Sequence, residues 1–123
     1  MATSAPAGWH SVTPRLVVRD PAKMVQFLRD TFGATGALVE NAPAQMLIGD
    51  SIVMVSATGL RDFRPAFLYV YVDDVDATYA KALQAGATSV EAPQAVPYGD
   101  RRAMVSDPWG NDWQIATYEG ARD

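Results

Sequence analysis

Few side chains in this sequence are suited to covalent or metal chemistry. The chain has no cysteine, which excludes disulfides, thiolate nucleophiles and thiolate metal sites. Its single histidine, His10, lies near the start of the chain, whereas zinc, nickel and iron sites usually take two or more histidines. Nothing around His10 resembles a Ser-His-Asp arrangement, so we interpret it as a surface residue. What remains is recognition by aromatic, amide and arginine side chains, or acid–base chemistry by a carboxylate such as Asp100.

Alternation along the predicted strands gathers polar and aromatic side chains on one surface. One strand carries Phe67, Tyr69 and Tyr71 on one face and aliphatic residues on the other, and Arg15 lies on the mixed face of an earlier strand. We expect this surface to hold a planar or aromatic ligand, with arginines donating charge-assisted hydrogen bonds to an anionic group. The expected ligand-binding residues are Thr13, Arg15, Met54, Phe67, Tyr69, Arg101, Trp109 and Gln114.

The same residues can also have purely structural roles. Tyrosines on a strand more often serve packing or an interface than a ligand. Arg15 equally suits an edge strand that has to stay soluble. The functional interpretation depends on several strands presenting such side chains on the same surface, which is typical of a pocket with a few placed polar groups.

The elements that position these residues follow a repeated order. In the first half, Asp20-Pro21 is typical of a helix N-terminus and Gly33 of a helix end. Gly49-Asp50 predicts a tight hairpin. We expect a strand at 11–19, a helix at 21–32, and strands at 35–40, 45–48 and 51–56.

The same order returns after a linker at 57–65. Placing Val18 on Val72 also places Asp20 on Asp74. We expect a strand at 66–72, a helix from 75 to about 85, and strands at 88–91, 102–106 and 112–118. This duplication predicts an α+β fold with helices packed on one face of the sheets.

The expected organisation is an N-terminal tail, one domain and a C-terminal tail. The tails span 1–9 and 119–123, and the domain at 10–118 contains two βαβββ modules at about 11–58 and 66–118. A length of 123 residues with 49% hydrophobic residues suits one globular domain. The net charge of -4 argues against nucleic acid and anionic membranes as partners. No long apolar run or signal-peptide pattern is present, so we expect a cytoplasmic protein.

Four segments of the chain resemble a known family. They are Gly8 to Asp20, Phe32-Gly33-Ala34, Tyr98-Gly99-Asp100-Arg101, and Asp107-Pro108-Trp109-Gly110-Asn111-Asp112-Trp113. These segments are similar to the PhnB-like branch of the vicinal oxygen chelate superfamily, which comprises glyoxalases, bleomycin-resistance proteins and dioxygenases. The resemblance implies two βαβββ modules that form a cupped mixed sheet with the helices on its outer face.

The resemblance also identifies where a metal would be held in the enzymes of that superfamily. Carried over residue by residue, the four ligand positions are Thr13, Met54 (to within one or two residues), Phe67 and Gln114. Phenylalanine cannot ligate, methionine is too soft and threonine is weak, so only Gln114 is suitable. The histidine of the family's closing signature is replaced by Asn111. We therefore expect no metal and no cofactor, which argues against glyoxalase and extradiol dioxygenase activity.

The leading hypothesis is a metal-free small-molecule-binding protein, and one form of this function is sequestration of an antibiotic-like compound. An alternative is an isomerase or lyase that uses a metal carried by its substrate or an acid–base residue such as Asp100. A third is a structural or regulatory dimer with a filled cup. The resemblance further implies a homodimer, in which module one of one subunit faces module two of the other.

Overall fold

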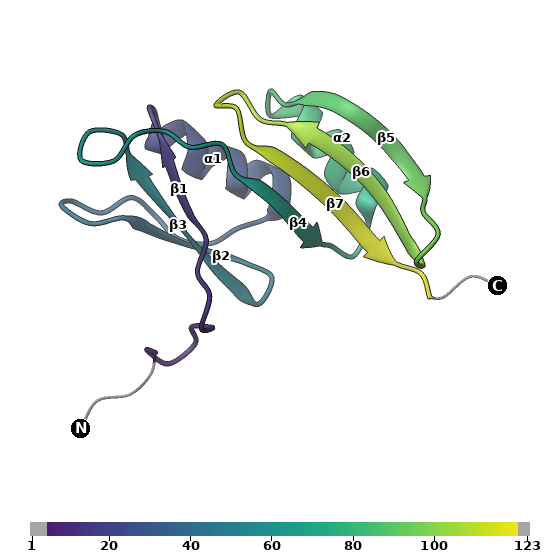
Figure 1. Ribbon diagram of the computed structural model, residues 1–123, viewed down its shortest axis with the longest axis horizontal. Helices are drawn as coiled ribbons and strands as arrows, with labels where there is room; N and C mark the ends of the chain where they lie inside the picture. Colours follow the sequence, from purple (N-terminus) through teal and green to yellow (C-terminus); the bar gives the residue numbers. More distant parts are fainter. Residues whose placement is uncertain (1–4, 121–123) are drawn as a thin grey trace. The chain divides into compact units, whose positions relative to one another are not determined.

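The computed structural model describes residues 5–120 of the chain (Figure 1). These residues form two compact units. The first contains residues 5–29 and 33–64, and the second contains residues 30–32 and 65–120. Each unit has one sheet of mixed strand direction, and residues 5–120 contain two helices. The predicted α+β fold class is confirmed.

The sheet of the first unit has three strands in the order β1-β3-β2. They are β1 (Arg15–Val18), β2 (Ala44–Ile48) and β3 (Ser51–Ala57), with β1 parallel and β2 antiparallel to β3. Ile48 and Ser51 pair on either side of the predicted two-residue hairpin. Alternate residues of all three strands are buried, which gives this unit an aliphatic core on one face of its sheet.

Helix α1 (Pro21–Phe32) follows β1 and begins and ends as its sequence predicts. A side-chain oxygen of Asp20 accepts a hydrogen bond from the backbone nitrogen of Lys23 at 3.1 Å, which satisfies one of the unpaired donors of the first turn. Gly33 closes the helix in the left-handed conformation, with φ of 65°, which glycine adopts without the strain that a Cβ atom brings.

The prediction of a strand at 35–40 is wrong. This segment makes only two isolated bridges, Thr35 with Leu47 and Val39 with Ala42. Gly36 lies at φ of 131°, where a Cβ atom would collide with the carbonyl oxygen of Gln45. Because of this positive φ, the segment does not run as a regular strand. The first module is therefore βαββ.

The second unit has the full set of four strands, in the order β4-β7-β6-β5. They are β4 (Phe67–Tyr71), β5 (Thr88–Ala95), β6 (Asp100–Ser106) and β7 (Asp112–Tyr118), of which β4 and β7 are parallel and the other pairs antiparallel. Helix α2 (Val75–Gln84) packs on β5, β6 and β7. Asp74 caps it through the backbone nitrogen of Ala77, as the duplication with Asp20 predicts.

Two strand boundaries in the second unit differ from the prediction. β5 continues past residue 91 to Ala95, because register shifts on either side of Glu91 let the strand pass through Pro93. β6 starts at Asp100 instead of Arg102. Neither helix in the described part of the chain is long and apolar enough to cross a membrane.

Candidate functional site

The sheet of the second unit has one buried face and one aromatic face. On β4, Leu68 and Val70 pair with Trp113 and Ile115 of β7, both of which are fully buried. The alternate residues Phe67, Tyr69 and Tyr71 are 65%, 37% and 60% exposed. The predicted alternation of β4 is thus confirmed. We call Phe67, Tyr69 and Tyr71 the aromatic face.

A buried carboxylate lies beneath two of these tyrosines. Asp100, the first residue of β6, is only 1% exposed. Its Oδ2 accepts hydrogen bonds from the hydroxyls of Tyr69 at 2.5 Å and Tyr71 at 2.9 Å. Its Oδ1 is also buried and has no hydrogen-bond partner among residues 5–120. One oxygen of Asp100 therefore anchors the aromatic face, and the other retains its capacity to accept.

Further polar contacts extend from this cluster. The hydroxyl oxygens of Tyr69 and Tyr98 lie 3.2 Å apart, and Arg102 donates from Nη1 to the Tyr98 hydroxyl at 2.6 Å. Arg102 Nη2 also lies 3.9 Å from Glu91 Oε2. These contacts hold the tyrosine side chains in one orientation.

Two tyrosines of this cluster, Tyr69 and Tyr71, have raised pKa values. Burial, together with the hydrogen bond to Asp100, raises the pKa of Tyr69 far above its ordinary value. The hydrogen bond to Asp100, followed by burial, raises the pKa of Tyr71. Because both shifts favour the protonated hydroxyl, Tyr69 and Tyr71 act as donors to Asp100 at neutral pH.

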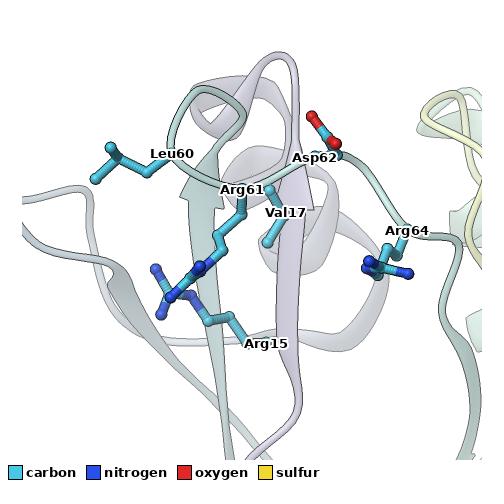
Figure 2. Close-up of a pocket in the computed structure, with 6 residues that line it drawn as sticks. All are labelled: Arg15, Val17, Leu60, Arg61, Asp62 and Arg64. Atoms are coloured by element: carbon cyan, nitrogen blue, oxygen red, sulfur yellow. The ribbon is translucent and has the colours of Figure 1, made fainter.

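Arg15 belongs to a hollow in the first unit. It lies on the exposed face of β1, and its Nε donates to Ser56 Oγ of β3 at 3.1 Å. Figure 2 shows this hollow, which has a volume of about 350 Å³. The lining residues are Arg15, Val17, Leu60, Arg61, Asp62 and Arg64.

The structure brings some of the expected binding residues together within each unit. In the first unit Arg15 and Met54 pair across β1 and β3, and half-buried Thr13 precedes β1. In the second unit Tyr69 pairs with Gln114 across β4 and β7, beside Phe67.

Arg101 and Trp109 lie elsewhere in the second unit. Arg101 alternates with Asp100 along β6, and its guanidinium pairs with Asp76 of α2 at 2.8 Å. It therefore lies on the helix side of the sheet. Trp109 lies in the turn between β6 and β7, where its backbone nitrogen donates to Asp107.

The closing motif that carries the resemblance serves to fold this turn. Asp107 is 5% exposed and accepts hydrogen bonds from the backbone nitrogens of Trp109 and Asn111 and from the side chains of Asn111 and Trp113. The Asn111 side chain in turn accepts from the backbone nitrogen of Ala66, just before β4. The motif thus joins the start of β7 to the start of β4 and so positions the aromatic face.

The sequence does not predict most partners of the tyrosines, nor the second arginine that lines the hollow beside Arg15. Tyr98, Arg102 and Arg61 are not among the residues that the sequence predicts to bind a ligand, and it suggests Asp100 only as an acid–base group. The signal for Asp100 was its alternation with Arg102 and Met104, but the strand was predicted to begin two residues too late. Arg61 carried no such signal, because its position depends on the path of the linker after β3.

The four positions that hold a metal in the superfamily's enzymes do not fit one here. Thr13 offers a weak hydroxyl, Met54 a thioether and Phe67 nothing, and only Gln114 has a suitable oxygen. Residues 5–120 also contain no cluster of three or more histidine, cysteine, aspartate or glutamate side chains that could hold a metal ion.

Comparison with known proteins shows a consistent set of relatives. The model of the Glyoxalase/Bleomycin resistance protein/Dioxygenase superfamily matches residues 9–115. An uncharacterised protein of Mycobacterium bovis is 32% identical over 127 aligned positions, which cover 85% of this chain and 81% of that protein.

Solved structures agree with this match. TioX from Micromonospora sp. ML1 has a TM-score of 0.76 and 28% identity, covering 87% of this chain and 97% of its own. FosX from Mesorhizobium loti, a fosfomycin resistance protein, shares the fold with a TM-score of 0.66 and 20% identity, covering 86% of this chain and 89% of its own. With 107 of its 123 residues inside the matched range, this chain belongs to the glyoxalase/bleomycin resistance protein/dioxygenase superfamily.

Proposed function

We propose that this protein is a metal-free small-molecule-binding member of its superfamily, of the PhnB-like branch, and that its ligand is planar or aromatic. The observation that carries the proposal is the aromatic face held in place by buried Asp100. Three large aromatic side chains on one open sheet face are unusual on a surface that meets only water. An aromatic ligand stacks on such rings and covers them.

Hydrogen bonding on this face suits a ligand with a donor group. The Tyr69 and Tyr71 hydroxyls donate their protons to Asp100, so toward a ligand their oxygens can act only as acceptors. Gln114, which pairs with Tyr69 across the strands, adds an amide that both donates and accepts. The combination of apolar area with a few fixed polar groups is typical of small-molecule sites.

The names of the relatives support one form of this function. The superfamily includes bleomycin-resistance proteins, and FosX is named for fosfomycin resistance. Sequestration of an antibiotic-like compound is the corresponding proposal for this chain. The cytoplasm is the proposed location.

The proposal is tested with a neutral aromatic probe, 1-naphthol, in buffer that contains a chelator. Amide resonances in β4 and β7 are expected to shift as the probe is added. The Phe67→Ala and Tyr71→Ala variants should weaken binding at least about threefold, in line with the roughly 0.5–1.5 kcal/mol of an aromatic pair. Phe63→Ala is the matched control, because Phe63 is also partly exposed, at 37%, but lies in the first unit. Equal binding by all variants would defeat the proposal.

We also propose that the protein is a homodimer. Several large apolar side chains are exposed on the single chain, including Val12 at 82% and Leu60 at 99%. Among residues 5–120 each sheet is short and ends in two edge strands, β4 and β5 in the second unit and β1 and β2 in the first, of which β2 is bridged only at Leu47, by Thr35. A two-fold interface would bury the exposed apolar side chains and cover the unpaired edge strands.

The second candidate function is enzymatic, with Asp100 as the acid–base residue of an isomerase or lyase. It is favoured by the buried Oδ1 of Asp100, which has no partner among residues 5–120. This candidate predicts that a bound compound is recovered chemically altered after incubation with the protein, and that Asp100→Asn, whose side chain still offers an acceptor oxygen to the two tyrosines, stops the change. Recovery of the compound unaltered supports the binding function.

A further inference from the structure

Two arginines in the first unit face a common space without a counter-ion. Figure 2 shows the guanidinium groups of Arg15 and Arg61 turned toward each other in the hollow that both line. The carboxylate of Asp62 points away from that space. Among residues 5–120, Arg15 makes only a hydrogen bond to the neutral Ser56 hydroxyl, and Arg61 makes no side-chain hydrogen bond or ion pair.

Two neighbouring positive charges without an acidic partner among the described residues are unexpected in a chain with a negative net charge. The chain has a net charge of -4, yet the hollow is lined by three arginines and one aspartate. Like charges that converge repel one another, and an anion between them relieves the repulsion. Guanidinium groups present forked donors that match the oxygens of a phosphoryl or carboxyl group.

A second, larger hollow adjoins the first and shares Arg15, Leu60 and Arg61 with it. Its volume is about 640 Å³. Much of its wall is apolar and comes from the loop before β2 and the loop after β3, which contribute Leu38, Val39, Ala42, Pro43 and Leu60. Leu38 and Val39 are 45% and 57% exposed, so apolar area lies directly beside the paired charges.

We infer that these two hollows form a binding site for a small amphiphilic oxyanion, with its phosphoryl or carboxyl head between Arg15 and Arg61 and its apolar body against Leu38 and Val39. Nη atoms of Arg15 remain free to donate, because only its Nε is used by Ser56. The site is built entirely from the first unit. It therefore stands independently of the aromatic face and of the function proposed for it.

The test uses hexyl phosphate as the probe, measured by titration calorimetry at low salt. Inorganic phosphate supplies the head alone and hexanol the body alone, and both should bind more weakly than hexyl phosphate. Arg15→Gln and Arg61→Gln should each weaken hexyl phosphate about tenfold, the loss expected for one charge-assisted hydrogen bond. Hexanoate distinguishes the two kinds of head group. If hexanoate binds as tightly as hexyl phosphate, the site is suited to a carboxylate ligand; if it binds more weakly, the site is suited to a phosphoryl ligand.

Lys23→Gln is the matched control, because it removes the same charge from exposed helix α1 of the same unit. Its affinity for hexyl phosphate should equal that of the natural protein. Thermal unfolding of each variant checks that it is folded. No binding of hexyl phosphate, or an equal loss in Lys23→Gln and Arg61→Gln, would overturn the inference. A failure of 1-naphthol binding leaves it standing.

Discussion

Asp100 is the residue on which the aromatic face depends. Burying a carboxylate costs several kcal/mol unless hydrogen bonds replace the lost water. The Tyr69 and Tyr71 hydroxyls replace part of that water at Oδ2, while Oδ1 has no partner among residues 5–120. The arrangement fixes the tyrosine rings but leaves one carboxylate oxygen of Asp100 without a hydrogen bond in the described part of the chain. An unfavourable local feature of this kind is typical of a functional site.

Removing one of these donors should destabilise the protein. Tyr69→Phe takes a hydrogen bond from a buried charge, so we expect a loss of about 1–3 kcal/mol in the free energy of unfolding. Tyr79→Phe is the control, because it removes only the exposed bond between the Tyr79 and Ser89 hydroxyls. Urea unfolding at neutral pH measures both. Equal effects of the two variants would show that the carboxylate does not depend on Tyr69.

The raised tyrosine pKa values predict how stability falls in alkali. Tyr69 has a folded pKa above its unfolded value of about 10, so its contribution is complete below that pH and is lost as the pH rises further. We expect the absorbance of tyrosinate to show Tyr69 and Tyr71 ionising only above the ordinary pH for a tyrosine, or on unfolding. Tyr69→Phe should remove one of these late transitions. A single transition at the ordinary pH for all tyrosines would contradict the cluster.

The residues at the four metal positions predict that the purified protein carries no stoichiometric divalent ion. Thr13, Met54 and Phe67 supply too few ligands beside Gln114. Elemental analysis of protein purified without chelator measures the content. About one ion of zinc, nickel, iron or manganese per chain, lost in Gln114→Ala, would contradict this prediction.

At the scale of elements, local signals predicted the helices and most of the strands. Asp20, Asp74 and Gly33 mark helix ends through short-range chemistry that a sequence shows directly. The prediction of a strand at 35–40 fails because Gly36 takes a positive φ in a place where only glycine fits beside Gln45, which the residue types of the segment do not reveal. The register of β6 was hidden for the same reason: it depends on pairing with β7.

The contrast between local signals and contacts of distant residues also explains how much of the site could be predicted. Alternation within β4 was enough to predict that Phe67 and Tyr69 share an open face. The link from Tyr69 to Asp100 spans 31 residues, and the meeting of Arg15 with Arg61 depends on a linker without regular structure. Contacts of this kind follow from tertiary packing, which periodicity does not report.

Gly36 provides a test at this scale. Gly36→Ala forces a Cβ atom against the Gln45 carbonyl in a conformation that alanine rarely adopts, so we expect it to cost more than about 1 kcal/mol. Gly33→Ala is the comparison, because Gly33 also has a positive φ but has open space around its Cβ position. Urea unfolding should rank Gly36→Ala as the more destabilised. The reverse order would show that residues 35–40 do not follow the described path.

At the scale of the whole molecule, the exposed apolar residues and edge strands predict a homodimer. Its interface should be two-fold and bury more than about 1,000 Å². Size-exclusion chromatography with light scattering at micromolar concentration should give twice the 13.3 kDa mass of one chain. The mass of a single chain at all concentrations would contradict the dimer, and the apolar surface would then need another partner.

The central claim, that the protein binds a small aromatic molecule without a metal, is tested most directly by titration calorimetry of 1-naphthol. The titration is run on one protein sample treated with chelator and on another supplied with zinc, nickel, manganese or iron(II). We predict saturable binding with the same affinity in both, because neither Phe67 nor Met54 can serve a hard metal site. Binding that occurs only in the metal-supplied sample, or no binding in either, would contradict the account.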